Sequence, residues 1–181
     1  MGQQLSAMRL SRTCAAPREA VFDMLADLRS HLRWAGSEQS RDFRLLSMDA
    51  PDGPARAGTV FTTTGTIPMS AKRWEDRSTV TVADRPSTFE FVTEAHAGRG
   101  SNAMQARYVH RYELAPTQTG CTVTYTMTQE QIAHPILRLA LPVVRQMMWS
   151  VGIPKFAGRG FSNLLQDAEA AAKPEAAGAR A

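Results

Sequence analysis

The feature that most constrains this chain is a long run, residues 42–129, in which apolar and polar side chains alternate with a period of two. Such alternation is typical of antiparallel strands that bury one face and expose the other. Turn-forming segments rich in glycine, proline and aspartate divide the run. We expect strands at residues 42–49, 58–65, 72–82, 88–95, 104–114 and 121–129. Because successive strands joined by short turns usually pair, an antiparallel meander is predicted.

Elements with a different pattern flank this meander on both sides. Residues 4–14 alternate like one further strand, and residues 18–28 carry apolar side chains at helical spacing. Pro17 suits the first turn of that helix, and the helical pattern continues through residues 30–36. Residues 156–173 form an amphipathic pattern that predicts a helix lying on an apolar surface. The fold class predicted from the residues is therefore α+β.

The length of 181 residues suits one domain, which we place at residues 1–173. An apolar segment broken by prolines, about residues 131–153, separates the last strand from the C-terminal helix. Three roles are compatible with this insert: capping a ligand site, contacting a membrane surface or a partner protein, and packing on the C-terminal helix. The residues after it, 174–181, are expected to be a disordered tail.

Charge and cysteine content exclude several classes of protein. The net charge of +4 comes from basic residues interleaved with acidic ones, so we expect no nucleic-acid partner. Cys14 and Cys121 belong to no CxxC pair, and the N-terminus lacks the apolar core of a secretory signal. The alanine- and arginine-rich composition is typical of a bacterial protein. A cytoplasmic location is therefore expected, as a monomer or a homodimer.

The sequence contains no recognisable motif for a metal, a cofactor or a nucleophilic enzyme. The four histidines show no ligand spacing with one another or with the cysteines, so neither a metal nor another cofactor is expected. There is no GxSxG elbow, and the glycine-containing segments lack the context of a phosphate-binding loop.

Counting outward from the turns predicts which side chains share the inner face of the sheet. The count places His110 opposite Tyr125, Val80 opposite Phe91, and Val82 opposite Phe89. Many inward positions are then polar: Asp76, Ser78, Thr93, Tyr108, His110, Tyr112 and Tyr125. A solid core rarely contains so many polar groups, because each needs a hydrogen-bond partner. The pattern therefore favours a partly hollow sheet that encloses a ligand pocket.

Four segments of the chain carry a resemblance to a known superfamily. They are CAAPREAVFDMLADLRSHLRW at residues 14–34, AGTVF at 57–61, VTVADRPSTFEF at 80–91 and TGCTVTYTM at 119–127. In sequence and in order they resemble the START-like (SRPBCC) superfamily, and within it the bacterial polyketide cyclase/dehydrase and lipid-transport group. The resemblance implies a helix-grip fold: a curved seven-stranded antiparallel sheet around a long C-terminal helix, with an N-terminal helical pair between the first two strands and a hydrophobic tunnel inside.

Two functions follow as expectations. The first is binding or transport of an apolar small molecule, such as a lipid, a quinone or a polyketide-like compound, in the tunnel. The residues predicted to contact it are Trp34, Trp74, Val80, Phe89, Phe91, Tyr108, His110, Tyr112, Tyr125, Met127, Phe161 and Leu165. The alternative is a cyclase or dehydratase that uses His110, Tyr125 and Asp76 as acid/base groups. For Asp76 two placements stay open, one inside the tunnel and one in solvent after a slip in strand phase.

Overall fold

The computed structural model describes residues 6–35, 44–66, 73–97, 103–133 and 153–173. Most of the predicted insert, and the predicted tail, lie outside these residues. The boundaries proposed for the domain therefore stay predictions.

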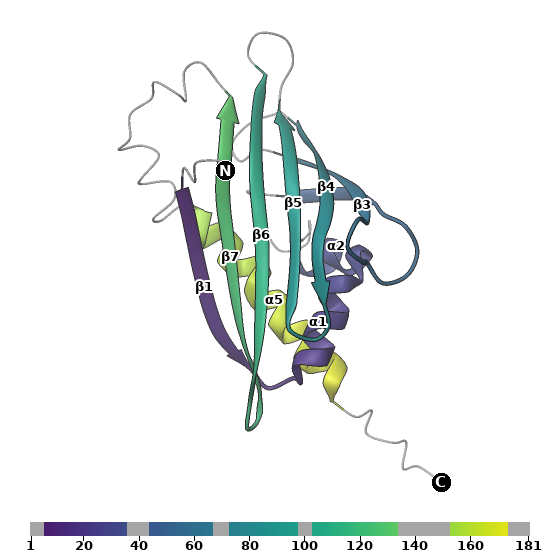
Figure 1. The fold of residues 1–181 in the computed structure, drawn as a ribbon, viewed down its shortest axis with the longest axis vertical. Coiled ribbons are helices and arrows are strands. Elements are labelled where there is room, and N and C mark those ends of the chain that lie inside the picture. The colour runs from purple at the N-terminus through teal and green to yellow at the C-terminus, as the bar shows by residue number, and fades with distance from the viewer. Residues whose placement is uncertain (1–5, 36–43, 67–72, 98–102, 134–152, 174–181) are drawn as a thin grey trace.

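A seven-stranded antiparallel sheet forms the frame of the molecule (Figure 1). Its strands follow the spatial order β1-β7-β6-β5-β4-β3-β2, so β2 to β7 are a meander and β1 closes against the last strand. Their bounds are β1 Ser6–Cys14, β2 Arg44–Asp49, β3 Val60–Thr66, β4 Arg73–Asp84, β5 Thr88–Ala97, β6 Met104–Thr117 and β7 Gly120–Ala133. The predicted meander is confirmed.

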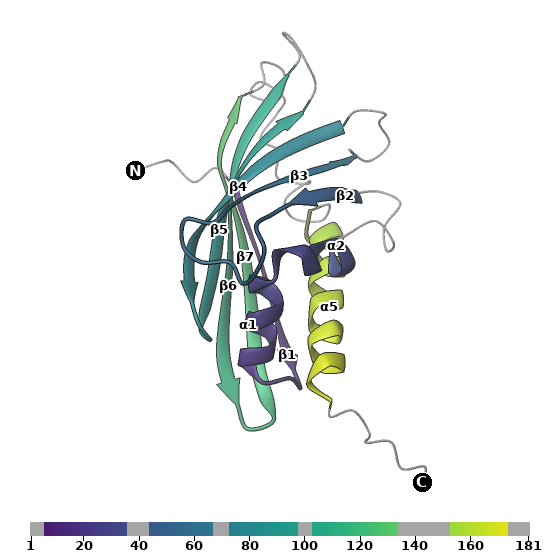
Figure 2. The same cartoon turned by 90° about the vertical axis from the view of Figure 1, so that its right-hand side faces the viewer.

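The helices lie on the concave side of the curved sheet, as Figure 2 shows. Helix α1 (Arg18–Ala26) is followed by a 3₁₀ turn (Leu28–Ser30) and the short helix α2 (His31–Trp34), which together are the predicted helical pair. Helix α5 (Ile153–Ala172) turns one apolar stripe towards the core, with Phe161, Leu164, Leu165 and Ala168 buried. This arrangement confirms the helix-grip fold. No helix in the described residues is both long enough and apolar enough to span a bilayer.

The core fills the space between α1, α5 and the lower half of the sheet. Phe22 of α1 meets Phe89 of β5 edge-to-face, with ring centroids 5.9 Å apart. Val21 and Leu25 of α1 are fully buried, as is Leu164 of α5. Each such side chain stabilises the fold by about 1.5–3 kcal/mol through burial of apolar surface.

Gly120 fixes the tight contact between the β6–β7 hairpin and the end of β1. Its φ of +154° is rarely adopted by residues with a side chain, and a Cβ atom there would overlap the carbonyl oxygen of Cys14. Cys14 lies opposite Cys121 in the register of β1 and β7. Both thiols are free and buried, and burial raises the pKa of Cys14 to about 11. They are small core side chains and not reactive thiolates.

Two predicted strand registers are wrong. The first error leaves the side chains on their predicted faces, and the second moves Val82 off the inner face. Thr117 pairs with Gly120 across a two-residue turn, which places His110 opposite Met127 and Tyr112 opposite Tyr125. The prediction assumed a longer turn and was therefore displaced by two residues, a shift that keeps every side chain on its face.

The second error comes from a bulge in β4. Val80 lies opposite Phe91 as predicted, but the register then shifts, so Ala83 lies opposite Phe89 and Val82 lies opposite Glu90. An extra residue in one strand cannot be recognised from alternation alone.

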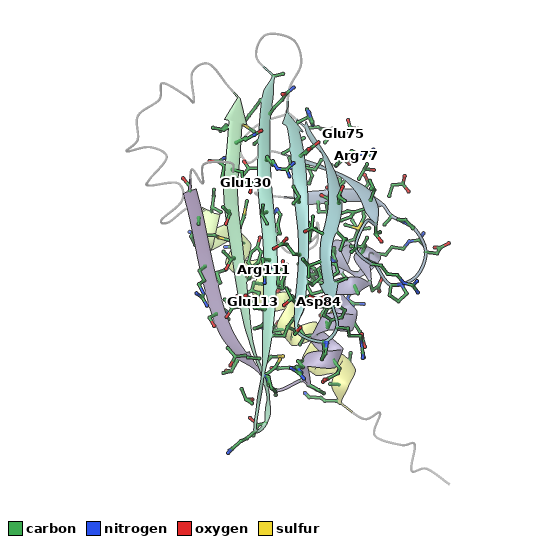
Figure 3. The ribbon with its side chains drawn as sticks, in the orientation of Figure 1. Glu75, Arg77, Asp84, Arg111, Glu113 and Glu130 are labelled. Atoms are coloured by element: carbon green, nitrogen blue, oxygen red, sulfur yellow. The ribbon has the colours of Figure 1, made fainter. Side chains whose placement is uncertain are left out.

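The convex face of the sheet is polar. Arg111 pairs with Glu90 at 2.9 Å and with Glu113 at 3.2 Å, and Arg107 pairs with Glu94 and Glu130. Figure 3 shows Arg111, Glu113 and Glu130 on the face turned away from the helices. Such partly exposed pairs add little to stability. The convex face is therefore the solvated face of the sheet, and the helices lie on the opposite, concave face (Figure 2).

Candidate functional site

An aromatic ladder crosses the concave face from β5 to β7. The Phe91 ring stacks on His110, with centroids 4.6 Å apart and planes inclined by 11°. Tyr112 stacks on Tyr125 in the same way, at 4.5 Å and 15°. The Nδ1 atom of His110 and the Tyr125 hydroxyl are 2.8 Å apart, a hydrogen-bond distance. The two candidate catalytic residues are therefore in contact, although diagonally and not as direct cross-strand neighbours.

Burial sets the protonation of this ladder. It lowers the pKa of His110 to about 4, and a second, smaller contribution comes from His31. The imidazole is therefore neutral at pH 7, and its Nδ1 shares a hydrogen bond with the Tyr125 hydroxyl. Burial also raises the pKa of the Tyr112 and Tyr125 phenols, so both keep their protons. A neutral histidine with one nitrogen occupied is a weak general acid at this pH.

His31 and Trp34 are both buried in the core. The Nε2–H of His31 donates to the Leu25 carbonyl over 2.9 Å, and burial lowers the pKa of this histidine to about 4. Trp34 is only 5% exposed, and its indole N–H donates to the Ser30 hydroxyl. Because α2 packs against α5, Trp34 lies inside the fold. Its predicted contact with a ligand stays a prediction.

Asp76 faces the concave side, which decides between the two placements predicted for it. Its neighbours Trp74 and Ser78 share the more buried face of β4, whereas Glu75 and Arg77 are exposed. Burial raises the pKa of Asp76 to about 7, and the backbone N–H of His96 lowers it. The Oδ1 atom is buried and has no hydrogen-bond partner among the described residues. Asp76 is thus a buried carboxyl group whose pKa lies far above the usual range for an aspartate.

Gln129 completes a polar cluster that sequence reasoning missed. Only 3% of this residue is exposed; its Nε2 donates to the Tyr108 hydroxyl over 3.3 Å. Its Oε1 is buried and unpaired within the described part of the chain. Burial raises the pKa of Tyr108, and the negative charge of Asp76 contributes to that rise. A period of two does place residue 129 on the face of Tyr125 and Met127. It does not show that the residue is buried.

The concave face is not uniformly closed. Tyr112, Val123 and Tyr125 are buried beneath the helices, where Tyr125 meets Phe161 of α5. Further along the same strands, Tyr108, His110 and Met127 are only half-buried, although they face the same way. Of the other residues predicted to contact a ligand, Val80, Phe89, Phe91, Phe161 and Leu165 are buried in the core, and Trp74 is half-buried.

Two surface hollows lie elsewhere. A groove of about 400 Å³ is lined by Arg12, Pro154, Lys155, Gly158, Arg159, Ser162 and Asn163, and a smaller one of about 220 Å³ lies on the convex face. Arg12 shares the side of β1 that carries Leu10 and Cys14, but it is exposed and donates to the Ser162 hydroxyl. Neither hollow borders Asp76 or His110. Within the described ranges no three histidine, cysteine or acidic residues are grouped as metal ligands.

Comparison with solved structures identifies the same architecture in bacterial proteins. The chain is similar to a protein from Chromobacterium violaceum at 15% identity and TM-score 0.59, with 94% of this chain and 99% of that one covered. For an uncharacterized protein from Rhizobium leguminosarum the values are 10% identity, TM-score 0.66, and 91% and 95% coverage. The solution structure of a protein from Staphylococcus epidermidis shares 14% sequence identity with this chain at TM-score 0.60, and 97% of each chain is covered.

These identities are low, so they support the fold alone. No curated protein matches the sequence. The model of the family described as "Polyketide cyclase / dehydrase and lipid transport" matches residues 7–164. The match spans most of the sheet and reaches into the C-terminal helix. This chain therefore belongs to the polyketide cyclase/dehydrase and lipid transport family, within the START-like fold.

Proposed function

We propose that this protein binds an apolar small molecule against the accessible part of the concave face. The observation that carries the proposal is the half-burial of Tyr108, His110 and Met127 on a face that is otherwise core. Large apolar and aromatic surfaces that face inward but stay accessible gain free energy when a ligand covers them. Burial of about 200 Å² of such surface contributes about 5 kcal/mol before the costs of association are subtracted.

The chemistry of this face supports a largely apolar ligand that also has a polar end. Met127 offers apolar contact, whereas Asp76, Tyr108 and Gln129 are polar. The description of the family, which combines polyketide chemistry with lipid transport, agrees with a ligand of this kind. A lipid, a quinone and a polyketide-like molecule all meet this requirement.

The uncharged fluorescent probe N-phenyl-1-naphthylamine tests the proposal. Its emission is expected to rise and saturate at one probe per chain, because it leaves water for the accessible apolar surface of the concave face. The measurement is a fluorescence titration, with the urea-unfolded protein as the control. Emission that stays at the level of the unfolded control would refute the proposed function.

Acid/base catalysis is a second candidate, and one observation favours it. Asp76 combines a pKa near 7 with an unpaired oxygen on the concave face, which are properties of a general base. His110, by contrast, has a pKa near 4 and a nitrogen bonded to Tyr125. If the family's cyclase chemistry applies to this chain, we therefore assign the base to Asp76 and a ligand-contact role to His110.

Deuterium exchange tests this second candidate. The 1,3-diketone 1-phenylbutane-1,3-dione has an acidic C–H bond like that of a polyketide, and proton NMR follows the loss of its signal in D₂O. Catalysis predicts that the protein accelerates exchange over buffer and that Asp76→Asn lowers the acceleration by about a hundredfold. Asp84→Asn, at the exposed end of the same strand, is the matched control. Equal exchange in Asp76→Asn and in the native protein would exclude Asp76 as the base.

A further inference from the structure

Two unpaired hydrogen-bond acceptors border the proposed ligand site. The Oδ1 atom of Asp76 and the Oε1 atom of Gln129 are both buried, and neither has a partner in the part of the chain that the structure describes. Gln129 donates to the Tyr108 hydroxyl, and Asp76, two strands away on the same face, is near enough for its charge to contribute to the raised pKa of Tyr108. The two acceptors thus belong to one polar cluster, contributed by β4, β6 and β7.

We propose that the ligand carries a hydrogen-bond donor, a hydroxyl or an amine, and that Asp76 and Gln129 receive it. This inference rests on the proposed function and deepens it by defining the polar end of the ligand. Buried acceptors without partners are rare in folded proteins, because each has lost its bond to water without a replacement. A donor on the ligand restores those bonds, whereas an apolar molecule of the same shape leaves them unmade.

The same two residues discriminate against an acidic ligand. An ionised carboxylate beside Asp76 would place two negative charges close together in a poorly solvated site. Gln129 offsets this only in part, because one N–H of its Nε2 already donates to Tyr108 and a single remaining N–H does not neutralise the repulsion between two carboxylates. If the amide oxygen and nitrogen were exchanged, the unpaired atom of Gln129 would be a donor, which a hydroxyl on the ligand satisfies as well, because a hydroxyl both donates and accepts. The site therefore favours an alcohol or an amine over a fatty acid.

Four ligands of equal chain length test the inference by displacing N-phenyl-1-naphthylamine at pH 8. They are 1-dodecanol, dodecylamine, dodecyl methyl ether and dodecanoate, of which the ether accepts but cannot donate. We expect the alcohol and the amine to displace the probe at concentrations about tenfold lower than the ether and the acid. The ratio between alcohol and ether isolates the donor, because their apolar portions are closely matched.

Substitutions of Gln129 and Asp76 test whether these two residues cause the preference for a ligand that donates a hydrogen bond. Gln129→Leu is expected to reduce the alcohol-to-ether ratio by about threefold or more, and Asp76→Asn to strengthen dodecanoate binding by a similar factor. Gln131→Leu, two residues along β7 and exposed, is the matched control and is expected to keep the native ratios. Both test substitutions remove an unpaired buried acceptor or charge, so they are not expected to prevent folding. Circular dichroism checks this.

The outcomes separate this inference from the proposed function. If the probe binds and the alcohol and the ether displace it equally well, the inference is overturned while the binding function stands. If Gln129→Leu and Gln131→Leu give the same ratio, Gln129 is not the acceptor and the inference is again overturned. If the probe does not bind at all, the proposed function is wrong and this inference falls with it.

Discussion

Replacing Asp76 with asparagine is expected to raise the free energy of unfolding at pH 8 by on the order of 2 kcal/mol. The cause is the cost of ionising a carboxyl group that burial has made more basic. Its pKa rises from 3.8 to about 7 in the folded protein, and its Oδ1 has no partner among the described residues. The full linkage value for such a shift is near 4 kcal/mol, which we halve because the residue retains some contact with solvent.

The effect of Asp76 on the free energy of unfolding depends on pH, because its carboxyl group titrates at different pH values in the folded and unfolded protein. Between pH 3.8 and about 7 the folded protein holds a proton on Asp76 that the unfolded chain releases, so stability falls as the pH rises through this window. Above about pH 7, the pKa of Asp76 in the folded protein, this loss of stability is complete. The stabilisation by Asp76→Asn is therefore expected to be larger at pH 8 than at pH 5.

His31 and His110 act in the opposite direction. Burial lowers both pKa values from 6.5 to about 4, so stability is lost as the pH falls through this range, where the unfolded chain binds protons that the folded protein excludes. In native protein the Asp76 contribution partly offsets this loss between pH 4 and 6.5. Asp76→Asn removes this offset. The stability of the variant is therefore expected to fall more steeply than that of the native protein as the pH falls from 6.5 to about 4.

Urea unfolding at pH 5 and pH 8 measures these effects, with Asp84→Asn as the matched control. Asp84 lies at the exposed end of β4, so its replacement is expected to change stability by less than about 0.5 kcal/mol at either pH. A loss of stability for Asp76→Asn at pH 8, or the same change at both pH values, would contradict the burial of an unpaired carboxylate.

A residue whose removal stabilises the fold needs a reason other than folding. Asp76 is costly because its oxygen is unpaired, and Gln129 shares this property on a neighbouring part of the concave face. Proteins commonly tolerate such losses at functional sites. The stability experiment therefore bears on the site as well as on the fold.

The faces of the strands could be predicted from the sequence because they depend only on alternation. Asp76, Tyr108 and His110 occupy the concave side as the period of two predicts. The contact between His110 and Tyr125 also formed, because their long side chains reach a diagonal neighbour two residues away. Errors in register of two residues therefore did little harm to the predicted site.

The strand pairing and the burial of Trp34 and Gln129 could not be predicted, because they depend on features that the alternation of polar and apolar residues does not encode. The bulge after Val80 and the two-residue turn before Gly120 changed the pairing of strands, and neither alters the polar and apolar pattern. The burial of Trp34 depends on α2 packing against α5, a long-range contact. Gln129 was overlooked because glutamine at the end of a strand is usually solvated, and only the fold reveals that it is buried.

Filling the accessible part of the concave face is expected to abolish ligand binding. Met127 is half-buried there, opposite His110, and Met127→Trp would add a large ring to the space that the ligand is proposed to occupy. We expect the affinity for N-phenyl-1-naphthylamine to fall at least tenfold, or about 1.4 kcal/mol. The neighbouring Thr126 points to the convex face beside Arg111, so Thr126→Trp adds the same ring on the other side of the sheet.

The pair of tryptophan variants is the most direct test of ligand binding on the concave face. Both are measured by the same fluorescence titration, after circular dichroism has established that each is folded. We expect Met127→Trp to lose the probe while Thr126→Trp binds it within about twofold of the native protein. Equal affinity in the two variants would contradict this expectation, since the ligand would then lie somewhere other than the face that carries Tyr108, His110 and Met127.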